Sequence, residues 1–475
     1  MRVFRKLVAD SFIYGLAGML LKLISFVTFP IFTRYFHPTD YATISLVSSV
    51  SLVLGTLSGW GLDSAAGRFF FDDSTTSYRN RLIKSWFIGR VCITFIFSLV
   101  FYIVYSIFLT GYFGLQSEYL SWLIISNLFL SIVPYMLNTL FVLYKRALLS
   151  LCVSVLLTLL SSIASLWFVV KENMGVTGFF AGQTLSFGFF TLAGVILYFL
   201  RVKKASVDFL LLKQMLIYGV KLLPGTLSNN FVFLIATIII KEQLGIATLG
   251  IFQVGYTLST LILFLTSGFS QAFVPHALQL NGDAFKNYCK QVFKFYAILL
   301  TICCLILALL MKDIIQLLLP SSYLLSWEVA GIMLFANFIL SFGHIASIGL
   351  IKTKKVEFYG MIIVIMNLSQ LIFIYFFTFL WGLEGTSIAL LANSFLTIIL
   401  LFYYAEKVYR IKYNFTLPLS FIIGSVFLYF VAIEFDFSLL PKIISLLFVF
   451  LIIFFWQLPR LKALLQLTTE NRQGL

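Results

Sequence analysis

Apolar runs of about 20 residues recur along nearly the whole chain, and the segments between them are short and polar. At a rise of about 1.5 Å per residue, a run of this length crosses the hydrocarbon core of a bilayer as one α-helix. Hydrophobic residues make up 61% of the sequence and charged residues only 11%, well below the charged share of a soluble protein. The sequence therefore predicts an all-α, polytopic membrane protein with no soluble domain.

The apolar runs predict fourteen membrane spans. The basic N-terminus is followed by an apolar stretch without a small-residue cleavage site, so we expect a retained first span rather than a signal peptide. The expected spans are 9–33, 41–62, 82–109, 120–142, 147–170, 176–200, 215–240, 246–270, 291–311, 327–351, 356–380, 384–405, 417–435 and 441–457.

The charges between the spans predict which side of the membrane each segment faces. With the N-terminus inside, the inside segments carry 25 Lys and Arg, and the outside segments carry 5. The five are Arg34, Lys171, Lys241, Lys312 and Lys442. An excess of this kind marks the cytoplasmic side. We therefore expect both termini in the cytoplasm, and the net charge of +15 reflects this topology rather than a surface for nucleic acid.

The chain repeats itself weakly at an offset of 207 residues, the separation of Gly175 from Gly382 and of Arg34 from Lys241. Six spans per repeat make the two halves parallel, which is typical of transporters whose site lies between the halves. Chance matching of residues that are common in membrane helices is the alternative explanation. The expected domains are an N-terminal lobe at 1–205, a C-terminal lobe at 206–412, and an extra helix pair with a cytoplasmic tail at 413–475.

Lys22 is the polar residue that most strongly indicates a site within the membrane. It lies near the middle of the first span, where a lysine costs roughly 2.5–3.5 kcal/mol on insertion scales. Its helical face also carries Ser11, Gly15, Gly18 and Ser25, and small or polar residues face protein or water rather than lipid. A cation that lines a substrate cavity is the functional interpretation. A structural lysine that snorkels or pairs with a carbonyl group is the alternative.

Three other basic residues are candidates with plainer alternatives. Arg90 and Lys221 lie within a turn or two of the inside ends of their spans, where a side chain that reaches the interface explains them nearly as well. Arg68 lies at the inside end of the second span, where a local ion pair with Asp63 is the alternative to substrate binding.

Neutral polar residues recur within the later spans. They are Asn229 in span seven, Gln253 in span eight, Asn337 and His344 on one face of span ten, and Asn367 and Gln370 one turn apart in span eleven. Each alone is typical of helix packing. Together they indicate a hydrated interior that suits hydroxyl groups, and the absence of mid-membrane acids favours an anionic substrate. Catalytic, metal-binding and phosphate-loop motifs are absent from the sequence, so we expect no enzyme and no cofactor.

Several segments resemble bacterial polysaccharide transporters, which include the O-antigen and capsule flippases of the multidrug/oligosaccharidyl-lipid/polysaccharide (MOP) flippase superfamily. The segment from Pro30 to Ala42 is similar to their segment after span one, and Gly61 to Phe69 resembles the end of their second span. Pro224 with Gly250 to Tyr256 resembles the start of their second half, and Gly382 to Gly385 their twelfth span.

This resemblance implies a two-lobed transporter with a central, V-shaped cationic cavity that opens alternately inward and outward. It implies a flippase in the bacterial inner membrane that moves an undecaprenyl-diphosphate-linked oligosaccharide from the cytoplasmic to the periplasmic leaflet. A glycan polymerase and a chain-length regulator are candidate partners. The candidate substrate-binding residues are Lys22, Arg34, Arg68, Arg90, Lys221, Asn229, Gln253, Asn337, His344, Asn367 and Gln370.

Two other functions remain as alternatives at this point. A multidrug exporter of the same superfamily fits the span count, but the sequence places no acid convincingly at mid-membrane to relay protons. A membrane glycan polymerase or ligase generally needs a long outside loop with catalytic residues, whereas the outside loops expected here are all short.

Overall fold

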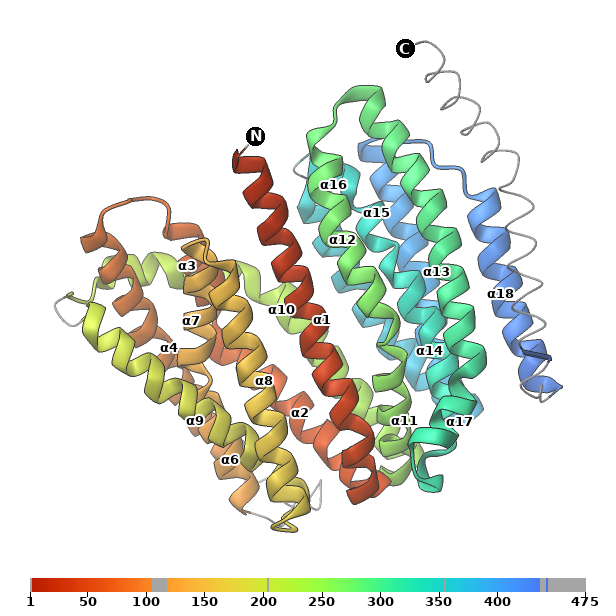
Figure 1. Ribbon diagram of the computed structural model, residues 1–475, viewed down its shortest axis with the longest axis horizontal. Coiled ribbons are helices and arrows are strands. Elements are labelled where there is room, and N and C mark those ends of the chain that lie inside the picture. Colours follow the sequence, from red (N-terminus) through yellow and green to blue (C-terminus); the bar gives the residue numbers. More distant parts are fainter. Residues whose placement is uncertain (1, 105–117, 203–204, 354, 436–440, 443–475) are drawn as a thin grey trace.

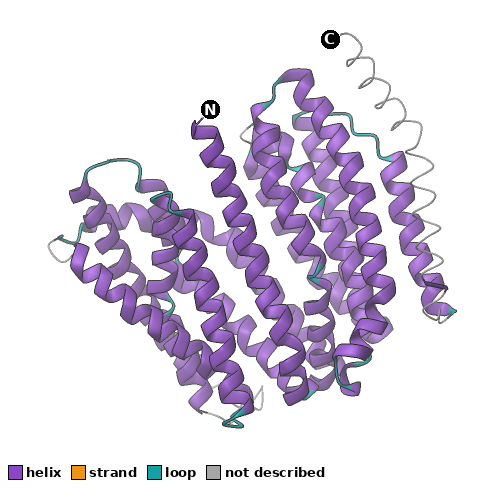
Figure 2. Cartoon of the chain, viewed as in Figure 1, coloured by secondary structure: helices purple, strands orange, loops and turns teal. Residues whose placement is uncertain are grey.

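The computed structural model describes residues 2–104, 118–202, 205–353, 355–435 and 441–442. Within these residues all regular elements are helices (Figures 1 and 2). Ten of the described helices are long and apolar enough to cross a membrane. The predicted all-α, polytopic membrane fold is therefore confirmed.

The helices follow one another with short connections, and several spans consist of two or three helices. In order, they are α1 (Arg2–Tyr35), α2 (Pro38–Gly59), α3 (Leu62–Phe69), α4 (Thr76–Val104), α6 (Glu118–Leu130), α7 (Ile132–Leu143), α8 (Ala147–Val170), α9 (Gly175–Val202), α10 (Phe209–Leu244), α11 (Ile246–Ser259), α12 (Ile262–Gln279), α13 (Gly282–Leu318), the 3-10 helix η2 (Ser321–Tyr323), α14 (Ser326–Ser341), α15 (Gly343–Ala346), α16 (Ile348–Lys352), α17 (Val356–Val408) and α18 (Thr416–Glu434).

The helices match the expected spans closely. The ten apolar helices cover expected spans two to twelve, and span five is reproduced at Ala147–Val170. Helix α1 contains the first expected span, and α18 contains most of span thirteen. The expected span 441–457 lies almost entirely outside the described residues.

Helix α17 contains two expected spans because it is a hairpin rather than one rod. A straight helix of its 53 residues would be about 80 Å long, far more than a bilayer needs. At Gly382 the backbone leaves the helical region, with φ 60° and ψ −134°, values that suit glycine. The two arms then run side by side, since the Ser369 hydroxyl donates to Asn393 Oδ1 at 2.8 Å.

The helices form two bundles that diverge toward one end of the molecule (Figure 1). We call α2 to α9 the N-terminal bundle and α11 to α18 the C-terminal bundle. The end where α1 begins is named the inner end, and the opposite end the outer end, after the orientation that the charges predict. Helix α1 stands between the bundles and contacts α8 on one side and α12 on the other.

Helix α10 belongs to both bundles. Its first turns, including Leu211 and Met215, are buried with residues of α3, α4 and α7. Its second half packs on α17 of the C-terminal bundle. Pro224 lies between these parts, where it removes one helical hydrogen bond. The boundary between the two lobes, predicted between residues 205 and 206, stays a prediction. Because α10 packs on both bundles, this one helix connects the two predicted lobes.

Helix breaks occur at corresponding places in the two halves, as the repeat would require. The break between α2 and α3 corresponds to that between α11 and α12, and the break between α6 and α7 to that between α14 and α15. Gly175 and Gly382, which the offset of 207 pairs, both adopt positive φ, at 54° and 60°. These features agree with the repeat.

The buried apolar residues are arranged differently in the two bundles. In the C-terminal bundle they form one continuous cluster, which extends onto the outer ends of α1 and α2. In the N-terminal bundle they form two separate clusters. The inner cluster includes Trp86 and Met136, and the outer cluster includes Phe101 and Ile124.

Candidate substrate-binding site

Lys22 lies between the two bundles. It projects from α1, is half-buried, and places Nζ 5.5 Å from the centre of the Phe264 ring on α12. An ammonium group over an aromatic face is stabilised by the ring quadrupole. The lysine thus reaches from α1 toward the C-terminal bundle, as expected of a residue in a site between the bundles.

Arg90 is buried inside the N-terminal bundle, with only 5% of its surface exposed. Its Nε lies 3.7 Å from Asp63 Oδ1, which also accepts a hydrogen bond from the Trp86 indole at 3.0 Å. The guanidinium lies against the backbone of Gly59, where any Cβ would collide with it. Arg90 therefore packs behind α2, and it does not snorkel to the interface.

The position of the Arg90–Asp63 pair follows from the helix break beside it. Trp60 and Gly61 both adopt left-handed φ, 48° and 65°, so α2 ends and α3 begins there. Arg90 lies beside the C-terminal end of α2, and Asp63 lies in the first turn of α3. Each charge therefore lies at the helix terminus whose dipole attracts it. Arg68 does not pair with Asp63; it forms an exposed ion pair with Asp72 at 2.6 Å instead.

Four carboxamides on α10 and α17 bind one another within the C-terminal side of the molecule. Asn367 Nδ2 donates to Asn229 Oδ1 and to the hydroxyl of Ser228. Asn393 Nδ2 donates to Gln370 Oε1 at 3.4 Å. These bonds join α10 to α17 and the two arms of α17 to each other, so much of the hydrogen-bonding capacity of these residues is used in packing.

Two further predicted residues join helices. Gln253 on α11 accepts a hydrogen bond from the Ser45 hydroxyl of α2 at 2.9 Å, across the two bundles. Asn337 on α14 is buried and donates to the Ser259 hydroxyl at 2.9 Å, at the break between α11 and α12. Both contacts fit the packing role that was the alternative for neutral polar residues.

The remaining predicted residues, Arg34, Lys221 and His344, are exposed on α1, α10 and α15. The contacts therefore do not bring the eleven predicted residues into one cluster. Of this set, Lys22 on α1 is the cation with a contact across the space between the bundles.

The outer end of the molecule is closed by an aromatic cluster that the sequence did not indicate. Tyr323, fully buried after α13, donates its hydroxyl to the Phe36 carbonyl at 2.8 Å. Its ring meets the ring of Tyr41 edge to face at 5.7 Å, and Tyr41 meets Phe29 at 5.8 Å. Beside them, a Cβ at Gly250 would collide with the Pro38 carbonyl, so α11 and α2 touch through their backbones.

Asn230 is a second residue that the sequence reasoning missed. Its Nδ2 donates to the Thr56 hydroxyl of α2 at 2.6 Å and thereby joins α10 to α2. The sequence does offer a signal for Asn230, because it directly follows Asn229 in a span that was already expected to carry a polar site residue. No comparable signal marked Tyr323, which lies in a short connection between spans.

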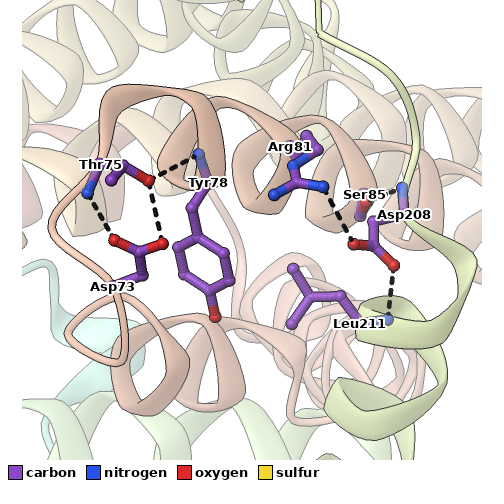
Figure 3. A network of polar contacts seen from close by, with 7 residues as sticks. All are labelled: Asp73, Thr75, Tyr78, Arg81, Ser85, Asp208 and Leu211. Atoms are coloured by element: carbon purple, nitrogen blue, oxygen red, sulfur yellow. Dashed lines mark hydrogen bonds and ion pairs between the residues drawn. The ribbon is translucent and has the colours of Figure 1, made fainter.

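The start of α10 is fastened to α4 at the inner end (Figure 3). Asp208 caps α10 by accepting from the Leu211 N–H, and its own N–H donates to the Ser85 hydroxyl. Arg81 lies 3.9 Å from the same carboxylate, and Lys84 donates to the Ala205 carbonyl at 2.7 Å. The connection between the two repeats is therefore held against the N-terminal bundle.

Nearby, the turn before α4 is held by Asp73 (Figure 3). Its carboxylate accepts hydrogen bonds from the backbone N–H and the hydroxyl of Thr75. These bonds lower the pKa of Asp73, with a smaller contribution from Arg81 and Arg79. The turn is thus favoured above the pKa of an unfolded aspartate and weakens as the pH falls through its lowered value.

A cavity of about 230 Å³ lies in the C-terminal bundle between α13, α14 and α18. Its polar lining comes from Lys312, Trp327, Tyr429 and Lys442. None of the eleven predicted residues lines it, so it is separate from the predicted site.

Residues 7–281 match the family model described as polysaccharide biosynthesis protein, which covers more than half of the chain. The chain belongs to this family. The resemblance found in the sequence is thereby confirmed. A search of curated protein sequences finds no match.

Solved structures of MOP-superfamily transporters share the fold. The lipid II flippase MurJ in an inward closed conformation aligns with a TM-score of 0.69 at 14% identity, over 96% of this chain and 99% of MurJ. A multidrug resistance MATE family transporter of the MOP superfamily aligns in its inward-facing conformation with a TM-score of 0.61 at 15% identity, over 83% of this chain and 95% of that one. The outward-facing conformation of such a transporter aligns with a TM-score of 0.59 at 14% identity, over 86% and 96%. This family member thus has the fold of a MOP-superfamily transporter.

Proposed function

We propose that this family member is a flippase for an undecaprenyl-diphosphate-linked oligosaccharide, the repeat unit of an O-antigen or a capsule. It moves the oligosaccharide from the cytoplasmic to the periplasmic leaflet of the bacterial inner membrane, with both of its termini in the cytoplasm. The family match over residues 7–281 is the observation that carries this proposal. The fold shared with a lipid flippase supports it.

Alternating access fits the contacts between the bundles. At the outer end the bundles meet through Tyr323, Gly250 and Gln253. At the inner end their ribbons diverge (Figure 1). In the proposed orientation, these contacts correspond to a state closed toward the outside. Transport then requires the outer contacts to break while the bundles approach at the inner end.

Lys22 is the residue that we assign to the diphosphate. Its ammonium lies between the bundles, and opposite charges attract strongly where the local dielectric constant is low. Lys221, exposed on α10 near Pro224, is the second cation that we assign to the substrate as it passes between the bundles. Arg90 is excluded from direct contact in this state because it is buried behind α2.

A strain that lacks this protein tests the proposal. Loss of surface polysaccharide, with lipid-linked oligosaccharide accumulating on the cytoplasmic side, is the expected result, and expression of the wild-type chain restores export. Unchanged surface polysaccharide in the deletion strain would refute the proposal. A glycan polymerase and a chain-length regulator are the proposed partners, and co-purification from the native membrane tests their association.

The likeness to a multidrug resistance transporter favours one alternative, a multidrug exporter. In that case the deletion raises susceptibility to cationic drugs and leaves surface polysaccharide unchanged. The two functions therefore give opposite results in the same strain.

A further inference from the structure

The core of the N-terminal bundle is interrupted at mid-depth by a layer of polar side chains. On α4, Trp86 belongs to the inner apolar cluster and Phe101 to the outer one. The residues between them on the same helical face are Arg90, Thr94 and Ser98, spaced by four. All three are buried, with exposures of 5%, 0% and 5%.

The polar atoms of this layer are unsatisfied by the protein. Arg90 Nε and Nη1, Thr94 Oγ1 and Ser98 Oγ are buried and have no hydrogen-bond partner. Most buried threonines and serines of membrane helices satisfy their hydroxyls on a carbonyl one turn back, as Thr237 and Thr301 do here. Thr94 and Ser98 make no such bond, so their hydroxyls are available to a ligand.

The composition of the layer indicates what this ligand is. A row of unsatisfied groups in a membrane-embedded core is costly, and ordered water is the usual means of satisfying such groups. The row combines a guanidinium donor with hydroxyls that both donate and accept, a mixture that suits water, which does both. The row is about 12 Å long from Arg90 to Ser98, since eight residues of helix separate them.

The inner end of this row lies beside Asp63, whose side chain reaches the surface. The Asp63 side chain is 40% exposed, while its partner Arg90 is 6% exposed, so the carboxylate connects the buried row to the surface. Asp63 also adjoins the break between α2 and α3, where Gly61 touches the backbone of Gly219 on α10. Water that enters there would reach both the ion pair and the break.

We propose that the N-terminal bundle contains a file of water molecules along Arg90, Thr94 and Ser98, entered beside Asp63. This site lies within one bundle and is separate from the space between the bundles. Its ligand is water, which completes the hydrogen bonding of the Arg90 guanidinium and screens its pairing with Asp63. The pair can therefore loosen without leaving a dry, buried charge, which allows the adjoining helix break to move.

Cysteine accessibility tests the proposal. In the full-length chain with its native cysteines replaced, including Cys92 on α4, single cysteines are placed at positions 94 and 98. As matched controls, single cysteines replace Phe95 and Leu99, which are the next residues along α4. Their side chains are 62% and 55% exposed, on the side of α4 that faces away from the bundle core and toward lipid. Open membrane fragments are treated with silver ions, and the remaining thiols are labelled with a maleimide after unfolding.

The expected result is a loss of maleimide labelling at positions 94 and 98 but not at positions 95 and 99. Equal, full labelling at all four positions after silver treatment would overturn the proposal.

A second test, the melting temperature of Thr94→Val, does not depend on thiol chemistry. If the layer is dry, Thr94→Val removes an unsatisfied hydroxyl and raises the melting temperature, which also overturns the proposal. If the hydroxyl binds water, the same substitution lowers the melting temperature.

Discussion

Removal of the Tyr323 hydroxyl should loosen the closed outer end. In Tyr323→Phe the ring stays in place, but the hydrogen bond to the Phe36 carbonyl is lost. The bond is 2.8 Å long and joins the C-terminal bundle to the end of α1 in a fully buried place. Its expected contribution is about 1 kcal/mol. A change of this size multiplies the ratio of outer-open to outer-closed molecules by about five.

Labelling of a single cysteine that replaces Ala42 measures the ratio of outer-open to outer-closed molecules. Ala42 is fully buried next to Tyr41 on α2, and the substitution adds little volume. An impermeant maleimide applied from outside should label this cysteine about five times faster in Tyr323→Phe than in the wild-type background. A cysteine at Glu172, which is exposed just after α8, reports the labelling expected of an accessible residue.

Tyr413→Phe is the matched control. The Tyr413 hydroxyl is also buried and donates to a backbone carbonyl, that of Ile345 at 3.3 Å, but both residues belong to the C-terminal side. This variant should lower thermal stability and leave labelling at Ala42 unchanged. Equal labelling of Ala42 in both variants, at the wild-type rate, would refute the assignment of Tyr323 to outer closure.

Four further outcomes are expected. Lys22→Ala should abolish surface polysaccharide while the protein keeps its normal abundance in the membrane. Lys22→Arg should keep part of the export, because the diphosphate requires a positive charge at this position. Full export in the alanine variant contradicts the assignment of Lys22. Gly250→Val should keep the outer end from closing and cost about 1–3 kcal/mol there, since its side chain meets the Pro38 carbonyl; wild-type outer labelling contradicts this. Gly382→Ala should lower the melting temperature by straining the turn of α17, and an unchanged value argues against that strain. A cysteine replacing Thr353 should resist impermeant reagents from outside, and its efficient labelling refutes the predicted topology.

The positions of the helices were predictable because span length and hydropathy are local properties of the chain. Span five, 147–170, has the same bounds in the structure. The hairpin of α17 was also predictable, since it was expected as two spans that meet near Gly382. Glycine at this position allows the turn, and the repeat places Gly175 at the corresponding point.

The side-chain partners could not be predicted, since they depend on how the helices turn and break. The sequence suggested that Asp63 pairs with Arg68, five residues away. The left-handed backbone at Trp60 and Gly61 instead directs Asp63 toward α4, where it meets Arg90 and Trp86. For the same reason, the attachment of the first half of α10 to the N-terminal bundle is a tertiary property that hydropathy does not encode.

The two halves use polar residues in different ways, although their helices break at corresponding places. In the C-terminal half, Asn367 binds Asn229 and Asn393 binds Gln370, so these amides bind each other beside a continuous apolar core. In the N-terminal bundle, an ion pair and hydroxyls without protein partners lie between two separate apolar clusters. Neutral amide pairs fix helices relative to one another at little electrostatic cost. A buried charge pair with incomplete hydrogen bonding is easier to rearrange once water reaches it. The bundle that carries the charged helix break is therefore the better placed of the two to change shape during transport.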